Sequence, residues 1–243
     1  MSTRVILVTG ANGNLGRAIV EAFLAEAPAN FVWLGVHTRR ADADGLVQRH
    51  PARAACLKLD VTQPGAWKEA VEEILGRAGR LDVLVNNAGF HEDGLLATLP
   101  AESWQRVLDA NLHAVFHGCQ AVLPAMIGQR HGRIVNISSL SALLAPAGQS
   151  SYAAAKAGVL ALTQSVAKEV ARLGITVNAV CPGYVETEAL ASLGDDERKA
   201  ALARVPMRRF GTPAEVAAAV RFLACSDAGY ITGSWLKIDG GIF

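Results

Sequence analysis

The stretch RVILVTGANGNLG, residues 4–16, decides the fold of this chain. It begins with a short apolar run, Val5–Val8, of the composition typical of a buried strand. A glycine-rich turn follows at once, and residues 17–27 then place apolar side chains at helical spacing. Strand, turn and helix predict a βα unit whose glycines and helix N-terminus together bind a phosphate group. The alternative is an ordinary tight turn between a strand and a helix.

The alternation of strand and helix continues along the whole chain. Apolar runs predict strands at Val5–Val8, Phe31–Val36, Ala54–Leu59, Val83–Val85, Arg133–Ile137, Thr176–Val180 and Ser234–Ile238. Helical patterns fall near Gly16–Ala27, Pro64–Gly76, Glu102–Ile127, Ser150–Leu173 and Pro213–Ala224, the last with Thr212 as N-cap and Glu215 at the third position. This order predicts a Rossmann-type α/β fold: a doubly wound, parallel, seven-stranded sheet with helices on both faces.

No linker or repeat divides the sequence, so residues 1–243 are expected to form a single domain. The segment near 186–207 is polar for most of its length and has no strand pattern. Its position late in an α/β chain makes it the candidate for a mobile lid over a substrate.

Tyr152 and Lys156 lie four residues apart in an alanine-rich stretch. On a helix this spacing puts both side chains on one face, about 5–6 Å apart at Cβ. A neighbouring ammonium is expected to lower the pKa of the phenol from its usual value of about 10. Such a tyrosine can give a proton to a carbonyl oxygen or take one from an alcohol. Alone, the pair is no more than surface decoration, because this spacing is common on exposed helices.

A third hydroxyl is expected beside this pair. The predicted strand Arg133–Ile137 is followed directly by Ser138 and Ser139. Open α/β sheets bind ligands at the carboxyl ends of their strands, so Ser139 is expected to hydrogen-bond the same carbonyl oxygen as Tyr152. The alternative is that these serines only cap the end of the strand.

Together these residues resemble the short-chain dehydrogenase/reductase family over essentially the whole chain. The matching motifs are Thr9-Gly10 to Gly16, Asp60-Val61, Asn86-Asn87-Ala88-Gly89, Asn111, Ser139, Tyr152, Lys156 and Pro182-Gly183-Tyr184-Val185-Glu186-Thr187. The resemblance implies an oxidoreductase with a catalytic tetrad of Asn111, Ser139, Tyr152 and Lys156. It also implies that Lys156 binds the ribose hydroxyls of the cofactor and that Asn111 holds a water beside Lys156.

The resemblance further implies a dinucleotide site. Its residues would be Thr9, Gly10, Asn12, Asn14, Leu15, Gly16, Arg39, Asp60, Val61, Asn87, Ala88, Gly89, Tyr152, Lys156, Pro182, Gly183, Val185 and Thr187. Asn14 stands where the family has glycine. Asparagine is the best non-glycine residue for left-handed backbone, so we expect the turn to form.

The residues that follow the second predicted strand indicate whether the cofactor carries a 2′-phosphate. Enzymes that bind NAD usually place an acid there to hold the ribose 2′-hydroxyl. In this chain the strand instead leads into His37-Thr38-Arg39-Arg40. The guanidinium of arginine suits a 2′-phosphate, so we expect NADPH, with NADH as the lesser candidate. The alternative is that Arg39 and Arg40 simply face water.

Within the family the chain is most similar to bacterial 3-oxoacyl-[acyl-carrier-protein] reductases. The supporting stretches are Gln129–Arg133, Tyr152–Gly158, Gly174–Asn178, Val205–Met207 and Tyr230–Gly233. This similarity implies a cytoplasmic, homotetrameric ketoreductase of fatty acid biosynthesis. Acyl-carrier protein is acidic and needs a basic docking rim. Arg130 matches one docking arginine, whereas Leu173 occupies the second position and Arg172 precedes it, so Arg130 as a solvated surface charge stays the alternative.

Composition excludes other classes of protein. A net charge of +1 gives no attraction to nucleic acid, and no apolar run approaches the roughly 20 residues that span a bilayer. The first four residues lead straight into a strand, so no secretory segment is expected. Four separated cysteines predict reduced thiols. His113 and His117 have a metal-like spacing, but no third ligand accompanies them, so no metal is expected.

Other functions stay open at this stage. One is a dehydrogenase of a small alcohol, a sugar or a CoA thioester, because the lid carries no readable code for the substrate. Another is a non-catalytic NAD(P)-binding sensor. A monomer that buries Ile242 and Phe243 is the alternative to the tetramer, in which these C-terminal residues and the helices Glu102–Ile127 and Ser150–Leu173 would supply interfaces.

Overall fold

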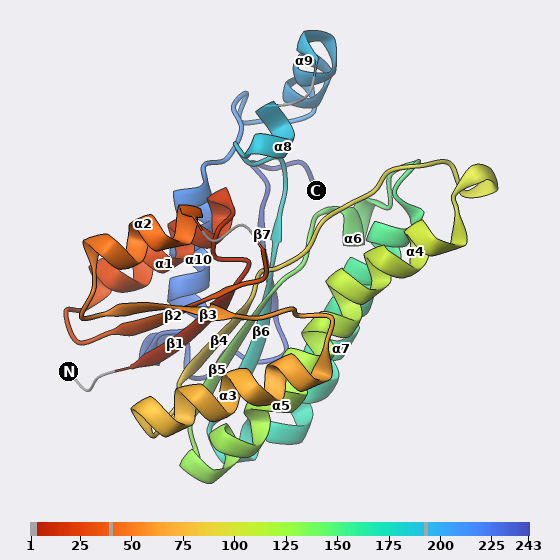
Figure 1. Ribbon diagram of the computed structural model, residues 1–243. Coiled ribbons are helices and arrows are strands. Elements are labelled where there is room, and N and C mark those ends of the chain that lie inside the picture. Colours follow the sequence, from red (N-terminus) through yellow and green to blue (C-terminus); the bar gives the residue numbers. More distant parts are fainter. Residues whose placement is uncertain (1–3, 39–40, 192–193) are drawn as a thin grey trace.

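Seven parallel strands form one sheet in the order β3-β2-β1-β4-β5-β6-β7 (Figure 1). The computed structural model describes residues 4–38, 41–191 and 194–243. The strands are β1 (Val5–Thr9), β2 (Phe31–Val36), β3 (Ala54–Lys58), β4 (Val83–Asn86), β5 (Gly132–Ile137), β6 (Ile175–Pro182) and β7 (Trp235–Ile238). The strand order reverses between β1 and β4, because β2 and β3 lie on one side of β1 and the later strands lie on the other. The crevice at such a point is where α/β proteins bind ligands.

Helices cover both faces of the sheet (Figure 1). One face carries α1 (Asn14–Glu26), α2 (Ala41–Arg49) and α10 (Pro213–Leu223); the other carries α3 (Pro64–Ala78), α5 (Ala114–Gln129) and α7 (Ser150–Val170). Strand β1 shows how the two cores divide: Ile6 and Val8 pack toward α1, and Val5 and Leu7 pack toward α3. Side chains alternate along a strand, so an unbroken apolar run is what a sheet buried on both faces requires.

The predicted strands and the predicted doubly wound fold are confirmed. Phe31–Val36 has the predicted bounds, and the other strands differ by one or two residues at an end. Helix α2 was not predicted. Ala43 and Leu46 are the residues it buries almost completely, so its apolar pattern is too short to recognise. At α10 the predicted cap forms, with Glu215 N donating to Thr212 Oγ1 at 3.3 Å.

The helix predicted near Glu102–Ile127 is present, but a π-helical turn interrupts its α-helical geometry. The segment contains α4 (Ala101–Leu108), a π-helical turn (Asp109–His113) and α5. The turn accommodates the buried side chain of Asn111, whose Nδ2 donates to Val107 O at 2.9 Å and to Phe90 O at 2.7 Å. Hydrogen bonds of this kind compete with helical periodicity but leave no trace in the spacing of apolar residues.

The segment predicted as a lid stands above the carboxyl edge of the sheet (Figure 1). It contains α8 (Glu188–Ala191) and α9 (Asp195–Ala203), which were not predicted. Leu190, Ala201, Val205 and Phe210 form a small apolar cluster of their own, against which Ile242 packs. Phe243 is 59% exposed, so the C-terminal residue is not buried within the chain. Within the described residues no helix is both long and apolar enough to cross a membrane.

The short helices complete the described chain. They are α6 (Ser141–Leu144), beside the start of α7, and the 3₁₀ turns Leu96–Thr98, Ala171–Leu173 and Ser226–Ala228. Within the described residues no disulfide joins the cysteines at positions 56, 119, 181 and 225, and the sequence predicts reduced thiols.

Two glycines of α5 test how tightly this helix packs on α3. A Cβ at Gly118 would lie 2.7 Å from the buried ring of Trp67, whereas a Cβ at Gly128 meets nothing within 4 Å. We expect Gly118→Ala to cost about 1–3 kcal/mol through overpacking. Gly128→Ala, the matched control, should stabilise by up to about 1 kcal/mol through helix propensity. Thermal unfolding measures both, and equal shifts in melting temperature would contradict the close α3–α5 contact.

Candidate active site

The residues predicted from motifs gather at the carboxyl edge of the sheet. Thr9 ends β1, and Asn87 and Ala88 follow β4. Thr9 Oγ1 accepts hydrogen bonds from Asn87 N and Ala88 N, both at 3.0 Å, and Asn87 Nδ2 donates to Thr9 O at 2.8 Å. These bonds fix the two loops on either side of the crevice where the strand order reverses.

The glycine turn brings its backbone close to the start of α1. Gly10 has φ +62°, and a Cβ at Gly16 would collide with Gly10 O. Gly13 is the N-cap of α1, and among the described residues no side chain caps the helix, so its first N–H groups are left without a side-chain acceptor there. The reason given for tolerating Asn14 is wrong: Asn14 is the first residue of α1 and is not among the described residues with positive φ.

The next part of the predicted dinucleotide site lies at the ends of β2 and β3. Asp60 Oδ1 accepts from Thr62 Oγ1 at 2.7 Å and from Thr62 N at 3.0 Å, and Asp60 Oδ2 lies 3.5 Å from His37 Nε2. Burial raises the pKa of Asp60, but the hydrogen bonds from Thr62 outweigh it, so the pKa lies below its usual value. Val61 O accepts from Trp67 Nε1 at 2.9 Å. Arg39 and Arg40 lie outside the described residues.

Tyr152, Lys156 and Ser139 lie together, as predicted. The Ser139 side chain lies close enough to the Tyr152 hydroxyl to lower the pKa of that phenol by hydrogen bonding. Lys156 is 3% exposed, its Nζ donates to Ile137 O at 2.9 Å, and Nζ lies 5.6 Å from the centroid of the Tyr152 ring. Ser138 Oγ donates to Lys156 O at 2.8 Å and so ties α7 to the end of β5.

The charge state of this group differs from the expectation. Burial raises the pKa of Tyr152, the hydrogen bond with Ser139 lowers it in part, and the carboxylate of Asp93 raises it further. The predicted lowering by Lys156 is therefore wrong for this structure. Burial also lowers the pKa of Lys156, to about 8, which weakens it as a permanent positive charge. The phenol is thus held protonated at neutral pH, in the form that donates a proton.

Asn111 joins the group through the π-helical turn. It is fully buried, and its Oδ1 has no hydrogen-bond partner among the described residues. A Cβ at Gly89 would collide with this oxygen and would lie 3.5 Å from Lys156 Nζ. Asn111, Gly89 and Lys156 therefore converge on one point, and the unsatisfied oxygen marks a place for a hydrogen-bond donor.

The last predicted segment leads from the sheet into the lid. Pro182 ends β6, and Gly183 N donates to Ile238 O at 3.0 Å. Val185 is buried, and Thr187 precedes α8, with its carbonyl accepting from Ala191 N at 2.9 Å. Thr187 thus stands where the rigid sheet meets the lid.

These features fit the dinucleotide that the motifs imply. Gly10, Gly16 and Gly89 have no room for a Cβ, the N-terminus of α1 is uncapped, and the buried Asn111 Oδ1 lacks a donor. A glycine-rich turn before an open helix N-terminus suits a pyrophosphate. Asn12 and Leu15, which also belong to the predicted set, lie in this turn at intermediate exposure.

Three residues near Tyr152 were not predicted. The His91 ring lies 5.8 Å from the Tyr152 ring, centroid to centroid, at an interplanar angle of 62°. His91 Nδ1 lies 3.0 Å from Asp93 Oδ1, and Gln149 Nε2 donates to Asp93 Oδ2 at 3.0 Å. The motif search had no signal for them, because each lies between motifs rather than within one.

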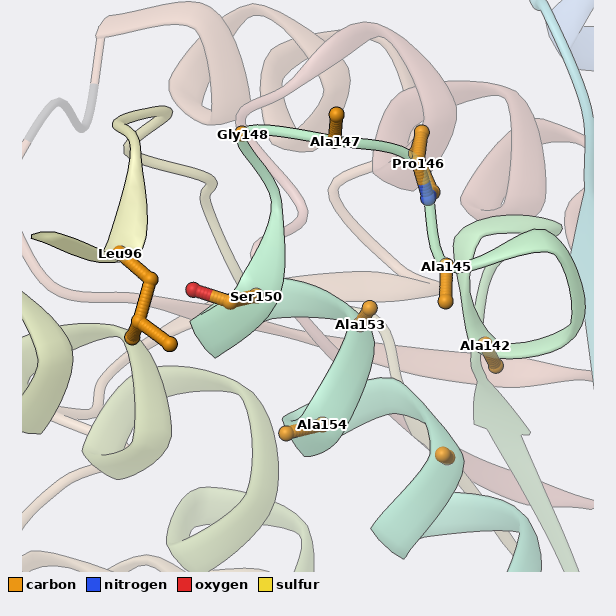
Figure 2. Close-up of a pocket in the computed structure, with 10 residues that line it drawn as sticks. Leu96, Ala142, Ala145, Pro146, Ala147, Gly148, Ser150, Ala153 and Ala154 are labelled. Atoms are coloured by element: carbon orange, nitrogen blue, oxygen red, sulfur yellow. The ribbon is translucent and has the colours of Figure 1, made fainter.

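A pocket of about 480 Å³ opens beside this group. Figure 2 shows it between Leu96, the loop from Ala145 to Gly148 and the start of α7. Its walls are mostly alanine and other small residues, and none of the four tetrad residues lines it. It is therefore a neighbour of the catalytic group rather than the catalytic cavity itself.

Two other predicted features lie elsewhere. Arg130 is the exposed C-cap of α5, with φ +52°, and Arg172 is exposed in the 3₁₀ turn after α7. From Tyr152 to Val170 the helix α7 is about 27 Å long, so this basic end is far from the catalytic group. His113 Nδ1 lies 2.7 Å from Asp109 Oδ1, and the described residues contain no cluster of three or more potential metal ligands.

Comparison with known proteins identifies the class. A family model described as Enoyl-(Acyl carrier protein) reductase matches residues 10–242. The chain belongs to the short-chain dehydrogenase/reductase family and is an NAD(P)-dependent oxidoreductase.

Similar proteins match this chain over almost its whole length and almost the whole of their own. The 3-oxoacyl-[acyl-carrier-protein] reductase FabG of Escherichia coli (strain K12) is 41% identical over 240 residues, covering 99% of this chain and 97% of that protein. FabG of Thermotoga maritima is 41% identical over 242 residues, covering 98% and 97%. The crystal structure of gox2181 has a TM-score of 0.93 at 34% identity, covering 100% of this chain and 96% of that one.

The buried amine of Lys156 gives a pH-dependent prediction for stability. Its pKa falls from 10.5 to about 8 on folding, which corresponds to about 3 kcal/mol against the protonated folded state. The unfolded lysine keeps a proton that the folded one releases between these values, so stability rises with pH across this window. Below pH 8, replacing the amine removes the free-energy cost of burying a protonated group.

We therefore expect Lys156→Met to be more stable than wild type at pH 7 by roughly 2 kcal/mol, after about 1 kcal/mol for the lost hydrogen bond. At pH 9.5 the gain should shrink markedly. Denaturant unfolding at both pH values measures it. Lys68→Met, at a side chain that is 77% exposed, is the control and should show no such dependence. A Lys156→Met gain that is independent of pH would contradict a charged, buried amine.

Proposed function

We propose that the protein reduces the ketone of a 3-oxoacyl thioester carried on acyl-carrier protein, with NADPH. The observation that carries this proposal is the proximity of the Ser139 side chain to the Tyr152 hydroxyl, whose pKa it lowers in part. Two O–H groups side by side suit one carbonyl oxygen at the reacting carbon. A carbon–carbon double bond, the target named in the description of the family model, has no oxygen at that carbon. The FabG relatives are named 3-oxoacyl-[acyl-carrier-protein] reductases, and this name supports a ketone substrate as well.

Each tetrad residue has a distinct role in the proposal. The nicotinamide, when bound, supplies hydride to the carbonyl carbon. Ser139 orients the carbonyl oxygen, and Tyr152 gives it a proton. Lys156 replaces that proton through its buried amine, whose pKa of about 8 suits transfer near neutral pH. Asn111 Oδ1 accepts from a water that links Lys156 to solvent.

The raised pKa of Tyr152 favours the reductive direction. Reduction needs a protonated phenol at the start, whereas oxidation of an alcohol needs a phenolate. Burial and the carboxylate of Asp93 both keep the proton on Tyr152.

The residues proposed to hold the cofactor follow the order of the chain. The glycine turn with the N-terminus of α1 would hold the pyrophosphate. Asp60, Val61 and the loop after β4 would hold the adenosine, and Thr187 would hold the carboxamide of the nicotinamide. Lys156 would also bind the ribose hydroxyls. The polar segment near 186–207 would close over the substrate as a lid within the single domain.

The proposal includes assembly into a homotetramer in the cytoplasm. Ala154, Ala157 and Ala161 are exposed along α7, and small residues let a second helix approach closely. Phe116 and Ile127 are 42% and 41% exposed on α5. Because Arg130 and Arg172 stand at the far end of these helices, a carrier protein docked there would serve the catalytic group of another copy.

The competing functions make different demands. A dehydrogenase of a small alcohol or a sugar would use the same residues in the opposite direction, with Tyr152 as the group that takes the proton of the alcohol. A non-catalytic sensor would have no use for the paired hydroxyls of Ser139 and Tyr152. A reductase of CoA thioesters shares the chemistry and differs only in the carrier.

Turnover of acetoacetyl-CoA with NADPH tests the function directly. We expect wild type to oxidise NADPH with this surrogate. Tyr152→Phe should lower turnover by at least roughly 10²–10⁴-fold because the proton donor is removed. NADPH binding, followed by fluorescence, should be unchanged. Turnover retained in Tyr152→Phe would refute the assignment of the acid.

The choice of NADPH rests on the arginine at position 39. We expect Arg39→Ala to weaken NADPH at least roughly tenfold while NADH is nearly unaffected, because a guanidinium–phosphate pair is charge-assisted. Calorimetric titration with both nucleotides measures the difference. Arg49→Ala, which removes a cation paired with Glu21 on the exposed surface, is the control. Equal losses for both nucleotides would contradict recognition of a 2′-phosphate.

A further inference from the structure

His91 contacts the catalytic tyrosine but has no part in the tetrad chemistry. Its ring meets the Tyr152 ring at an interplanar angle of 62°, an edge-to-face arrangement with centroids 5.8 Å apart. The His91 side chain is 48% exposed, so it forms part of the open side of the site rather than of the core. A solvent-facing ring held against the acid is well placed to meet the part of a substrate that adjoins the reacting carbonyl.

One nitrogen of this ring is already committed. His91 Nδ1 lies 3.0 Å from Asp93 Oδ1. A carboxylate only accepts hydrogen bonds, so Nδ1 is the donor. No hydrogen bond or ion pair of Nε2 is found in the described part of the chain. In the protonated ring Nε2 is a second donor, and it is the one available to a ligand.

Hydrogen bonds fix Asp93 relative to the catalytic hydroxyls. Gln149 Nε2 donates to both Asp93 oxygens, at 3.0 and 3.3 Å, and Gln149 Oε1 accepts from Ser141 Oγ at 2.8 Å. Ser141 N in turn donates to Ser139 Oγ at 3.1 Å. A continuous chain of bonds therefore runs from the partner of His91 to the partner of Tyr152. The loop itself is tied down where Gly94 N donates to Gly148 O at 2.8 Å.

The other acid of this loop is engaged elsewhere. Glu92 accepts from Arg106 Nη2 at 2.8 and 3.0 Å and from Ser103 Oγ at 3.1 Å, both on α4. Asp93 is thus the carboxylate that holds His91, and Tyr152 is the titratable ring it faces. When the His91 ring carries its second proton, the position next to the acid therefore offers Nε2 as a hydrogen-bond donor.

We propose that His91 is a specificity-determining residue whose Nε2 donates a hydrogen bond to the second carbonyl of a 1,3-dicarbonyl substrate. This inference rests on the proposed function, because a 3-oxoacyl thioester is such a substrate. Its thioester carbonyl is separated from the reacting ketone by a single methylene group. With the ketone oxygen on Ser139 and Tyr152, the thioester oxygen needs its own donor nearby, and a simple ketone does not.

A matched pair of probes isolates this contact. The first is the acetoacetyl thioester of N-acetylcysteamine; the second is the S-(3-oxobutyl) thioether, in which a methylene replaces the thioester carbonyl. We expect His91→Ala to lower kcat/KM for the thioester roughly 10- to 100-fold, the value of one hydrogen bond from a charged donor. The thioether should lose less than about threefold. The readout is the change, from wild type to variant, in the ratio of kcat/KM for the thioester to kcat/KM for the thioether. A ratio is needed because the thioester is intrinsically the more reactive ketone.

Two isosteric replacements separate donation from structure. The amide nitrogen of glutamine can reach the place of Nε2, whereas that of asparagine reaches only the place of Nδ1. We therefore expect His91→Gln to recover most of the ratio and His91→Asn to recover none. His113→Ala removes a second His–Asp pair of equal His exposure, 48%, on the π-helical turn, and should leave the ratio unchanged. Melting temperature and NADPH affinity check that each variant is folded.

The outcomes distinguish the two levels of the argument. Wild type that reduces neither probe would overturn the proposed function and the role of His91 together. Wild type that reduces the thioester while His91→Ala keeps the wild-type ratio would overturn the role of His91 alone. Equal rescue by glutamine and asparagine would also overturn it, since the ring would then act only as packing. A fall in the thioester-to-thioether ratio of kcat/KM in His91→Ala, restored by glutamine but not by asparagine, supports the proposed role of His91 as a hydrogen-bond donor.

Discussion

The burial of the Lys156 amine is the constraint around which the site is arranged. An ammonium that is 3% exposed must be satisfied by neighbours or lose its proton, and Lys156 Nζ donates to Ile137 O at the end of β5. The amine also lies close to Gly89, where any side chain would collide with Asn111. The loop after β4, the π-helical turn and the start of α7 therefore converge on one nitrogen. Burial lowers the pKa of Lys156 to about 8. The amine that is unfavourable to bury can therefore act as a proton donor near neutral pH.

Much of this arrangement is predictable from the sequence. Unbroken apolar runs such as Phe31–Val36 identify strands buried on both faces, and their alternation with helices predicts the doubly wound sheet. Motif residues then come together because parallel strands end at one edge. Tyr152 and Ser139 are found in this way, although they are separated along the chain and lie on different elements.

Other features follow from contacts that no local pattern encodes. The π-helical turn exists because Asn111 bonds Phe90 O, a partner on a distant loop. Among the described residues of helix α2, Ala43 and Leu46 are buried almost completely, so its apolar pattern is short. Burial is the main cause that raises the pKa of Tyr152, and the carboxylate of Asp93, which only the folded loop brings close, raises it further. Sequence spacing gives proximity along one helix, whereas a pKa depends on every charge and on burial in three dimensions.

The position of the lid explains why the substrate is harder to predict than the reaction. The residues that perform the chemistry end rigid strands, but α8 and α9 pack through their own small cluster above the sheet. Such a cluster can change its sequence without disturbing either main core, because it shares few contacts with them. The loop that carries His91 and Asp93 is different, since it is bonded through Gln149 and Ser141 to the catalytic serine. A substrate contact made from this loop would therefore be linked by hydrogen bonds to the catalytic serine, so that substrate selectivity and catalysis would depend on one network.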